Sequence, residues 1–282
     1  MENKKVVLAY SGGLDTSYCL KYLKNEKGFE VHTVLINTGG FDEAELKSIE
    51  DRAYELGSAK HANLTILDKY YDKAIKYLIY GNVLKNNTYP LSVSAERVFQ
   101  AIEAIKYAKS VGATAIAHGS TGAGNDQIRF DLIFQTIAPE IEIITPIRDL
   151  KLSRQEEVDY LAKNGVHYSW EKAQYSINKG LWGTSVGGKE TLTSSQPLPS
   201  EAYPSQLQKE DDEKVTLEFK SGELVAINGK KDKPSNNIVA LEKLANAFAI
   251  GRDIHVGDTI IGIKGRVGFE AAAPLIIIKA HH

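Results

Sequence analysis

The sequence has 282 residues, of which 43% are apolar and 25% are charged, and its formal net charge is −2. This is the composition of an ordinary globular protein with one large or two modest domains, and the balanced charge excludes a global field that would hold nucleic acid. Cys19 is the only cysteine, which excludes a disulfide framework and a multi-cysteine metal site. The N-terminus has no signal-peptide core and no segment is long enough to cross a bilayer, so we expect a cytoplasmic protein.

The first half of the chain alternates short apolar segments with segments of helical periodicity. Asp42 with Glu45 and Ser153 with Glu156 have the spacing of a capping box, so we expect helices to begin there. Alternation of this kind predicts a doubly wound α/β fold, in which helices cover both faces of a parallel sheet. We predict strands over residues 6–9, 31–37, 64–67, 114–117 and 142–145, and helices over residues 14–24, 42–56, 72–80, 94–110 and 153–165.

The pattern changes after about residue 166. Residues 189–214 are polar and contain three prolines, which indicates a long loop. We therefore predict a nucleotide-binding domain over residues 1–168 and a smaller α+β domain over residues 169–282. In this second part we predict strands over residues 215–219, 224–227, 259–263 and 275–279, with a hairpin turn at Ser221-Gly222 and a helix over residues 237–250 that ends before Gly251.

Residues 11–17, Ser-Gly-Gly-Leu-Asp-Thr-Ser, lie between the first predicted strand and the first predicted helix. Doubly wound folds bind ligands at this edge of the sheet. The glycines let backbone amides approach an anion, and the beginning of the helix contributes free N–H groups and its dipole. A plain turn would explain Ser-Gly-Gly alone, but not the hydroxyl groups of Thr16 and Ser17 beside it. The loop lacks the Gly-Lys-Ser/Thr ending of a Walker loop, so we interpret it as a phosphate-binding loop of another class.

Residues 118–130 follow the fourth predicted strand and contain three glycines and many polar side chains. Asn125 offers a donor and an acceptor, Asp126 a carboxylate, and Arg129 a planar guanidinium fork. A glycine-rich connection whose Asn and Asp serve turns would explain residues 124–126. It would not explain further polar residues directly before an apolar helix, so we predict that this loop encloses a small polar ligand.

Residues 9–17, Ala-Tyr-Ser-Gly-Gly-Leu-Asp-Thr-Ser, match the pyrophosphate loop of enzymes that cleave ATP to AMP and pyrophosphate. They resemble the argininosuccinate synthase form of that loop. Residues 118–130 resemble the second signature of the same family, although its members often carry Lys where this chain has Ala123. These motifs occur in the family's order over nearly the whole chain. Two further segments are similar to the family: residues 89–97 and residues 175–185.

The resemblance implies three ligand sites and a small set of catalytic residues. Ser94 would serve one site and also cap the helix that follows it. Trp182 and Cys19 are expected in the core, and His118 is expected to be structural. The resemblance assigns ATP to Ala9, Tyr10, Ser11, Gly12, Gly13, Leu14, Asp15, Thr16, Ser17, Ile36 and Gly119; citrulline to Tyr89, Ser94, Asn125, Arg129, Ser176, Ser185, Asp258 and Phe269; aspartate to Thr121, Asn125 and Asp126; and catalysis to Asp15, Asn125, Asp126 and Arg129.

The reaction that the resemblance implies has two steps. The ureido oxygen of citrulline attacks the α-phosphate of ATP and releases pyrophosphate. The amine of L-aspartate then displaces AMP from the citrullyl-adenylate and gives argininosuccinate, in arginine biosynthesis. Neither step needs a protein nucleophile, because positioning alone contributes up to roughly 7–11 kcal/mol. Mg²⁺ is expected on the phosphates of ATP, without a dedicated protein metal site.

Two alternatives remain open. One is another pyrophosphate-loop adenylating enzyme, for amidation or tRNA thiolation, although thiolation usually calls for reactive cysteines and a basic surface. The other is a non-catalytic ATP-binding fragment, because family members continue for a C-terminal segment that serves tetramer assembly. We therefore expect a homo-oligomer that assembles less completely than the family's tetramer, with small-molecule substrates and no nucleic-acid or membrane partner.

The chain departs from the family in the expected citrulline site. Alignment on residues 261–266 places Gly257 where the family has a Glu that receives the α-amino group, and Phe269 where it has a Tyr. An ammonium group without a charged partner in a desolvated pocket loses roughly 1.5–3 kcal/mol of hydrogen bonding. Either Asp258 replaces the Glu after a shift of one residue, or the substrate is an N-acylated citrulline, such as N-succinyl or N-acetyl, whose acyl group occupies the space at Gly257.

Overall fold

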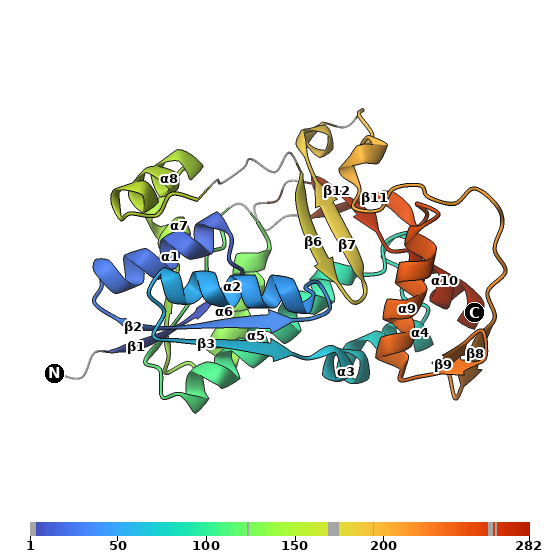
Figure 1. Ribbon diagram of the computed structural model, residues 1–282, viewed down its shortest axis with the longest axis horizontal. Helices are drawn as coiled ribbons and strands as arrows, with labels where there is room; N and C mark the ends of the chain where they lie inside the picture. Colours follow the sequence, from blue (N-terminus) through green and yellow to red (C-terminus); the bar gives the residue numbers. More distant parts are fainter. Residues whose placement is uncertain (1–3, 123, 169–174, 194, 259–261, 263) are drawn as a thin grey trace.

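A five-stranded parallel sheet forms the centre of the first half of the chain (Figure 1). The computed structural model describes residues 4–122, 124–168, 175–193, 195–258, 262 and 264–282. The strands lie in the order β3-β2-β1-β4-β5, so the order reverses between β1 and β4, which pair directly. The predicted doubly wound α/β fold is confirmed. The strands are β1 (Lys5–Ala9), β2 (Glu30–Asn37), β3 (Lys60–Thr65), β4 (Ala115–Ala117) and β5 (Glu142–Ile144).

Helices cover both faces of this sheet, because side chains alternate along each strand. In β1, Val6 and Leu8 pack in one core with α1 (Leu14–Asn25), α2 (Glu43–Glu55), α7 (Pro146–Leu150) and α8 (Arg154–Lys163). Val7, between them, packs in the opposite core with α5 (Ser92–Ser110) and α6 (Asp126–Ile137). Figure 1 shows α1, α2, α7 and α8 together on one side of the sheet. Cys19 is fully buried in the first of these cores, as predicted.

Local sequence signals place the starts of α1, α2 and α8 correctly. Both predicted capping boxes are present, one at Asp42 with Glu45 and one at Ser153 with Glu156. The predicted cap at Ser94 is wrong, because α5 begins two residues earlier, after Leu91. The Val93 N–H donates to the Tyr89 hydroxyl at 3.1 Å, so a side chain from the preceding turn takes the capping role.

The third strand and the helix after it differ from prediction. β3 occupies residues 60–65 rather than 64–67, and Leu67 already begins α3 (Leu67–Tyr70). β3 is an edge strand whose residues alternate between polar and apolar, so it lacks the apolar run of a central strand. The helical segment then continues through a π-helical turn (Tyr71–Ile75) into α4 (Lys76–Tyr80).

The described residues of the second half form two antiparallel sheets and two α-helices, in agreement with the predicted α+β fold. The hairpin at Ser221-Gly222 is confirmed between β8 and β9. One sheet has the order β11-β12-β7-β6 and the other β10-β9-β8. The elements are β6 (Ser176–Gly180), β7 (Gly183–Gly187), β8 (Leu217–Lys220), β9 (Glu223–Ile227), β10 (Lys230–Lys231), α9 (Pro234–Asn246), β11 (Arg252–Asp258), β12 (Lys264–Glu270) and α10 (Ala272–His281).

Several element assignments in this half are corrected by the structure. Residues 275–279 lie within α10 rather than in a strand, because a short apolar run reads the same in a buried helix as in a buried strand. The predicted helix over residues 237–250 begins earlier, at Pro234, and ends at Asn246. The predicted loop holds two 3₁₀ turns, at Lys189–Leu192 and Ser200–Ala202. Most of the strand predicted over residues 259–263 lies outside the described residues.

The segment from α3 to α4 joins the core of the second half, although it precedes that half in sequence by about a hundred residues. Tyr70, Ile75 and Ile79 are fully buried in one apolar cluster with Trp182 and Ile277. In Figure 1, α3 and α4 lie beside α9 and α10, away from the parallel sheet. Trp182 is fully buried, and its indole Nε1 donates to the Pro90 carbonyl at 2.9 Å, so the prediction that it belongs to the core is confirmed.

Candidate active site

The loops that follow β1 and β4 lie in contact at the point where the strand order reverses. A Cβ atom at Gly119 would lie 3.3 Å from the Cβ of Asp15 and 3.3 Å from the Cγ2 of Thr16. The two predicted ligand loops are therefore neighbours, and glycine at position 119 permits their close approach. Open α/β sheets bind ligands in this crevice outside the carboxyl ends of the strands.

The first loop is built mainly from backbone. Gly12 has φ +75, a conformation that favours glycine, and its Cβ would lie 3.0 Å from the Cγ1 of Ile49. Gly13 holds the cap position of α1, and no side chain caps this helix start. The Thr16 hydroxyl donates to the Gly13 carbonyl at 3.3 Å and closes the turn. The first turn of α1 thus presents backbone N–H groups and the helix dipole to the crevice, which suits an anion.

Arg52 on α2 holds this loop from behind, a role that sequence reasoning missed. Its Nη1 donates to the Gly12 carbonyl at 2.6 Å, and its guanidinium lies over the Tyr168 ring, 5.1 Å from the centroid. Arg52 is 40 residues from Gly12 in sequence. Only the packing of α2 beside α1 brings the two residues together.

The second loop is built from ion-paired side chains. Asp126, at the first position of α6, accepts from Arg129 Nη1 at 2.7 Å through one carboxylate oxygen. Its other oxygen accepts from the Nε of Arg97 on α5 at 3.1 Å. The Nη2 of Arg129 also donates to the Ser94 hydroxyl at 3.3 Å. Four residues from α5 and α6, three of them predicted site residues, therefore form one connected group.

Arg97 is the centre of this group. Besides Asp126, its guanidinium donates to Glu96 Oε1 at 3.1 Å, to Gln100 Oε1 at 2.7 Å and to Asn178 Oδ1 at 2.8 Å. Burial raises the pKa of Glu96 to about 7, although Arg97 and hydrogen bonds with Thr38 and Gln100 act in the opposite direction. The sequence shows an Arg near the expected citrulline segment, but not that it links α5, α6 and β6.

The predicted serines of the citrulline site lie on the β6–β7 hairpin. Asn178 pairs with Ser185 across the hairpin, and its Nδ2 donates to the Ser185 hydroxyl at 3.5 Å. Ser176 is exposed and lies two residues before Asn178, so the two share a face of β6. Asn178 also accepts from Arg97, so this face of the hairpin adjoins the group of Arg97, Asp126 and Arg129.

His118 is held by its neighbours. Its Nε2 lies 2.9 Å from Asp131 Oδ1, and the Ser120 N–H donates to its Nδ1 at 3.2 Å, which fits the neutral tautomer with the proton on Nε2. Burial alone would raise the pKa of Asp131, but hydrogen bonds from His118 and Arg148 outweigh it and lower that pKa. Both ring nitrogens of His118 are occupied, in agreement with the structural role expected for it.

Tyr89 and Phe269 are both buried in this structure. Tyr89 stacks on His255 with ring centroids 3.9 Å apart, and Phe269 packs against Tyr89 at 5.4 Å. Gly257 pairs with Gly265 in the β11–β12 ladder, and a Cβ built there would lie 3.7 Å from Lys85 Nζ. The prediction for the Asp258 side chain lies outside what the structure describes.

The remaining predicted residues are spread around the crevice. Ile36 lies near the carboxyl end of β2 and is buried, whereas Thr121 is exposed in the second loop. Asn125 holds the cap position of α6 without a side-chain capping bond. Ala9 ends β1 and Tyr10 is buried directly after it. Among the described residues, no group of three His, Cys, Asp or Glu side chains has the arrangement of a metal site.

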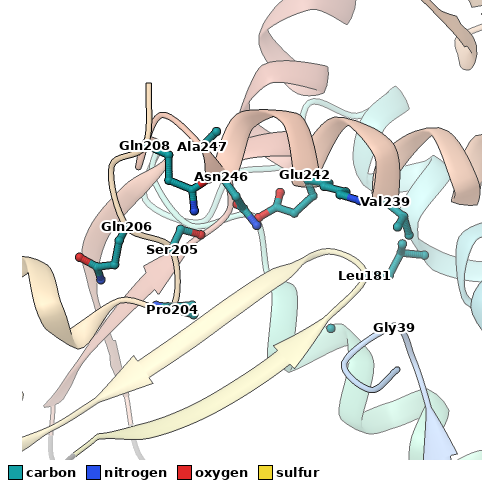
Figure 2. A pocket seen from close by; sticks show the side chains of 12 residues that line it. Gly39, Leu181, Pro204, Ser205, Gln206, Gln208, Val239, Glu242, Asn246 and Ala247 are labelled. Atoms are coloured by element: carbon teal, nitrogen blue, oxygen red, sulfur yellow. The ribbon is translucent and has the colours of Figure 1, made fainter. Parts of the chain in front are cut away.

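A cavity of about 610 Å³ lies away from this crevice, between the β6–β7 turn and α9. Figure 2 shows Glu242 and Asn246 on α9 facing Ser205 across it. Glu242 Oε2 accepts from the Ala273 N–H at 2.8 Å, at the beginning of α10. Burial raises the pKa of Glu242 to about 7. None of the predicted ligand residues lines this cavity, and the Glu242 carboxylate already accepts a hydrogen bond from the beginning of α10.

Two family models match the chain. The one described as "Arginosuccinate synthase N-terminal HUP domain" matches residues 5–167, and the one described as "Arginosuccinate synthase C-terminal domain" matches residues 175–282. The chain belongs to the argininosuccinate synthase family. The argininosuccinate synthase of Methanocaldococcus jannaschii is 38% identical over 98% of this chain and 70% of its own length. The argininosuccinate synthase of Xylella fastidiosa is 38% identical over 100% of this chain and 71% of its own length. The argininosuccinate synthase of Pyrococcus furiosus is 38% identical over 98% of this chain and 68% of its own length.

Membership in the argininosuccinate synthase family covers both halves of the chain, not only the phosphate-binding loop. It therefore separates this protein from the other pyrophosphate-loop enzymes considered above. The roles of individual ligand residues stay predictions. None of the helices in the described part of the chain is both long and apolar enough to span a bilayer.

Proposed function

We propose that this chain joins citrulline to L-aspartate with cleavage of ATP to AMP and pyrophosphate, and so forms argininosuccinate for arginine biosynthesis. Family membership over both halves supports the reaction. One structural observation carries the assignment of the site. The start of α1 touches the loop that leads to Asp126 and Arg129 on α6, and Arg97 of α5 pairs with Asp126. The proposed phosphate-binding and amino-acid-binding groups would therefore share one crevice.

In this proposal the first loop holds the phosphates of ATP. Backbone N–H groups at Gly13 and in the first turn of α1 would receive the phosphates, while Gly119 keeps the neighbouring loop close. Mg²⁺ would arrive with ATP as part of the substrate complex.

The second loop would position the two amino-acid substrates. Arg129 has a guanidinium fork that suits a carboxylate, and it lies beside the Ser94 hydroxyl on the expected citrulline side. Thr121, Asn125 and Asp126 would hold aspartate with its amine directed at the adenylate. Since a positioned amine needs no protein nucleophile, the role of these residues is orientation and charge stabilisation.

The form of the citrulline substrate is a second part of the proposal. Lys85 Nζ lies 3.7 Å from the position of a Cβ at Gly257, where the family resemblance places an acidic partner for the α-amine. A cation there opposes a free α-ammonium and favours an acyl group that carries a carboxylate. We therefore include an N-acylated citrulline, with N-succinyl-citrulline favoured over N-acetyl-citrulline, beside free citrulline.

The test is a direct assay of the purified chain. It is incubated with MgATP and L-aspartate and with citrulline, N-acetyl-citrulline or N-succinyl-citrulline, and AMP and pyrophosphate are measured. We expect AMP and pyrophosphate in equal amounts, only when a ureido acid is present. ATP binding without AMP formation for any of these substrates would contradict the ligase and favour a binding-only protein.

Two further features belong to the proposal. We divide the chain into a nucleotide-binding domain over residues 1–168 and a synthetase domain over residues 169–282, with the helical segment from α3 to α4 packed into the second core. We also propose a homo-oligomer. Light scattering that finds only monomers over a wide concentration range would contradict the homo-oligomer.

A further inference from the structure

A buried carboxyl group lies behind the phosphate-binding loop. Glu157 is on α8, which packs on α1, and only 4% of its surface is exposed. Within the described part of the chain, no N–H or O–H group donates to its Oε2, which is fully buried. A buried carboxylate oxygen without a donor is costly, so this group needs either a proton or a partner.

The group that faces Glu157 is another carboxyl, that of Asp15 in the first turn of α1. Burial, and then the charge and contact of Asp15, raise the pKa of Glu157 to about 8, while Arg154 acts weakly in the opposite direction. Two carboxyl groups in contact cannot both be ionised at low cost, whereas a shared proton gives a short hydrogen bond between them. At neutral pH the pair therefore carries one proton and one negative charge.

The thiol and the phenol on α1 beside the pair stay neutral over the relevant range. On α1, burial raises the pKa of the Cys19 thiol well above its ordinary value, and Asp15 and Glu157 add to this effect. Burial also raises the pKa of Tyr18 to about 12. A pH effect centred near 8 in this part of the molecule therefore belongs to the pair of carboxyl groups.

The position of Asp15 gives the pair a consequence for ligand binding. Asp15 is at the second residue of α1, and its Cβ borders Gly119, so its carboxylate adjoins the space proposed for the phosphates of ATP. A freely rotating carboxylate there would repel the phosphates. A hydrogen bond to α8 removes that freedom.

We propose that Glu157 is a positioning residue for the phosphate loop, whose protonated carboxyl donates a hydrogen bond to Asp15 and holds that carboxylate on the α8 side of the loop, away from the phosphates. The inference rests on the proposed function, because it assumes ATP in this crevice. It adds a residue to the site that lies outside both ligand loops.

The test compares the wild type with Glu157→Gln, which keeps a neutral donor at every pH, and Glu157→Leu, which removes the donor. Asp159→Asn, at an exposed position of the same helix, is the control. The dissociation constant of MgATP is measured by calorimetry between pH 6.5 and 9.5. We expect wild-type affinity to fall at least about fivefold relative to Glu157→Gln as the pH passes 8, because a second negative charge then forms beside the phosphates. Glu157→Leu is expected to bind weakly at every pH, and Asp159→Asn to follow the wild type.

A second measurement does not involve ATP. A carboxyl whose pKa is raised in the folded protein binds its proton more tightly there than in the unfolded chain, so its contribution to stability is lost as the pH rises towards the folded pKa. The melting temperature of the wild type should therefore fall relative to Glu157→Gln between about pH 5 and 8 and run parallel to it above.

The outcomes separate this inference from the proposed function. Parallel melting curves over the whole range would overturn the shared proton. Equal pH profiles of ATP affinity in the wild type and Glu157→Gln would overturn the positioning role, even if both bind ATP well. Absence of ATP binding in every variant, with the melting-temperature shift present, would overturn the positioning role and the proposed function together.

Discussion

The loops after β1 and β4 lie side by side, yet they are built in different ways. The first uses backbone: two glycines, an uncapped helix start and one hydroxyl that closes the turn. The second depends on side chains from α5, α6 and β6 that converge on Arg97 and Asp126. A backbone site is encoded by consecutive residues, whereas a side-chain site exists only after distant elements have packed.

The difference also affects how each loop tolerates change. The first loop should lose anion binding when an added side chain fills the space of the anion or strains the backbone of a glycine. The second is a partly buried ion-pair group, in which removal of one partner leaves other charges uncompensated, at a cost below the roughly 3–5 kcal/mol of a fully buried pair because the Asp126 side chain is 35% exposed. Mutations in the first loop should therefore weaken the binding of one ligand, whereas mutations in the second loop should weaken the binding of several ligands.

The largest expected effect is in the first loop. Gly13→Val should weaken ATP binding by at least about 100-fold, or about 3 kcal/mol, because its side chain occupies the space through which phosphate approaches the backbone. A Cβ at Gly13 would meet only the Ser11 hydroxyl, at 3.6 Å, so the variant should remain folded. Gly12→Val should block ATP too, but it should also lose stability, since φ is +75 and Ile49 lies close. Calorimetry and thermal melting distinguish the two, and normal ATP affinity in folded Gly13→Val would remove this loop from the site.

Asp126→Ala tests the second loop. It leaves Arg97 and Arg129 without their shared carboxylate, so kcat/KM for aspartate should fall about 100-fold, near 3 kcal/mol, while the dissociation constant of ATP changes less than about twofold. Steady-state kinetics with varied aspartate and direct ATP binding provide the two numbers. An equal loss in both would show that the loops are not separate in function.

The next largest effect is expected in the pH dependence of the free energy of unfolding. The pKa of Glu96 is raised to about 7, so the folded state holds a proton that the unfolded chain releases near its ordinary pKa of 4.5. Glu96 alone should therefore lower the free energy of unfolding by about 2–3 kcal/mol between pH 5 and 7, so Glu96→Gln should show a smaller slope than the wild type over that range. Chemical denaturation at several pH values measures it. Glu242→Gln, at a carboxyl with a similar shift in the second half, is the matched comparison.

Arg52→Met should have a smaller effect, on the first loop alone. It removes the charged hydrogen bond to the Gly12 carbonyl but keeps an apolar chain beside Tyr168. We expect ATP affinity to fall about tenfold, near 1.5 kcal/mol, with kcat/KM for aspartate at saturating ATP almost unchanged. A loss of aspartate specificity instead would place Arg52 in the second site.

The smallest expected effect is at the hairpin. Ser185→Ala removes one hydroxyl from the face shared with Asn178, so KM for the citrulline substrate should rise about fivefold, near 1 kcal/mol. The KM for ATP should stay unchanged in the same assay. An unaltered KM for every ureido acid tested would remove Ser185 from the citrulline site.

The features that the sequence predicts correctly depend on neighbouring residues, and the features that it misses depend on contacts between distant elements. The central strands, both capping boxes and the position of the glycine loop between β1 and α1 are correct, since each depends on residues within one turn or strand. β3 lies earlier than the predicted strand because an edge strand lacks a continuous apolar run. Residues 275–279 are helical although their apolar run predicts a strand, because this run is largely buried within α10. The cap of α5 was misplaced because the Tyr89 hydroxyl, rather than a neighbouring Ser, receives the free N–H.

The sequence by itself determined the parallel sheet with helices on both faces, the glycine loop between β1 and α1, and the resemblance that the family models confirmed. Only the tertiary structure decided that Arg97 joins three elements, that Arg52 supports the first loop and that Glu157 lies against Asp15. The physical reason is that hydrogen bonds within a turn depend on nearby residues, whereas a buried charge takes its partners from whichever elements the packing of the core brings beside it.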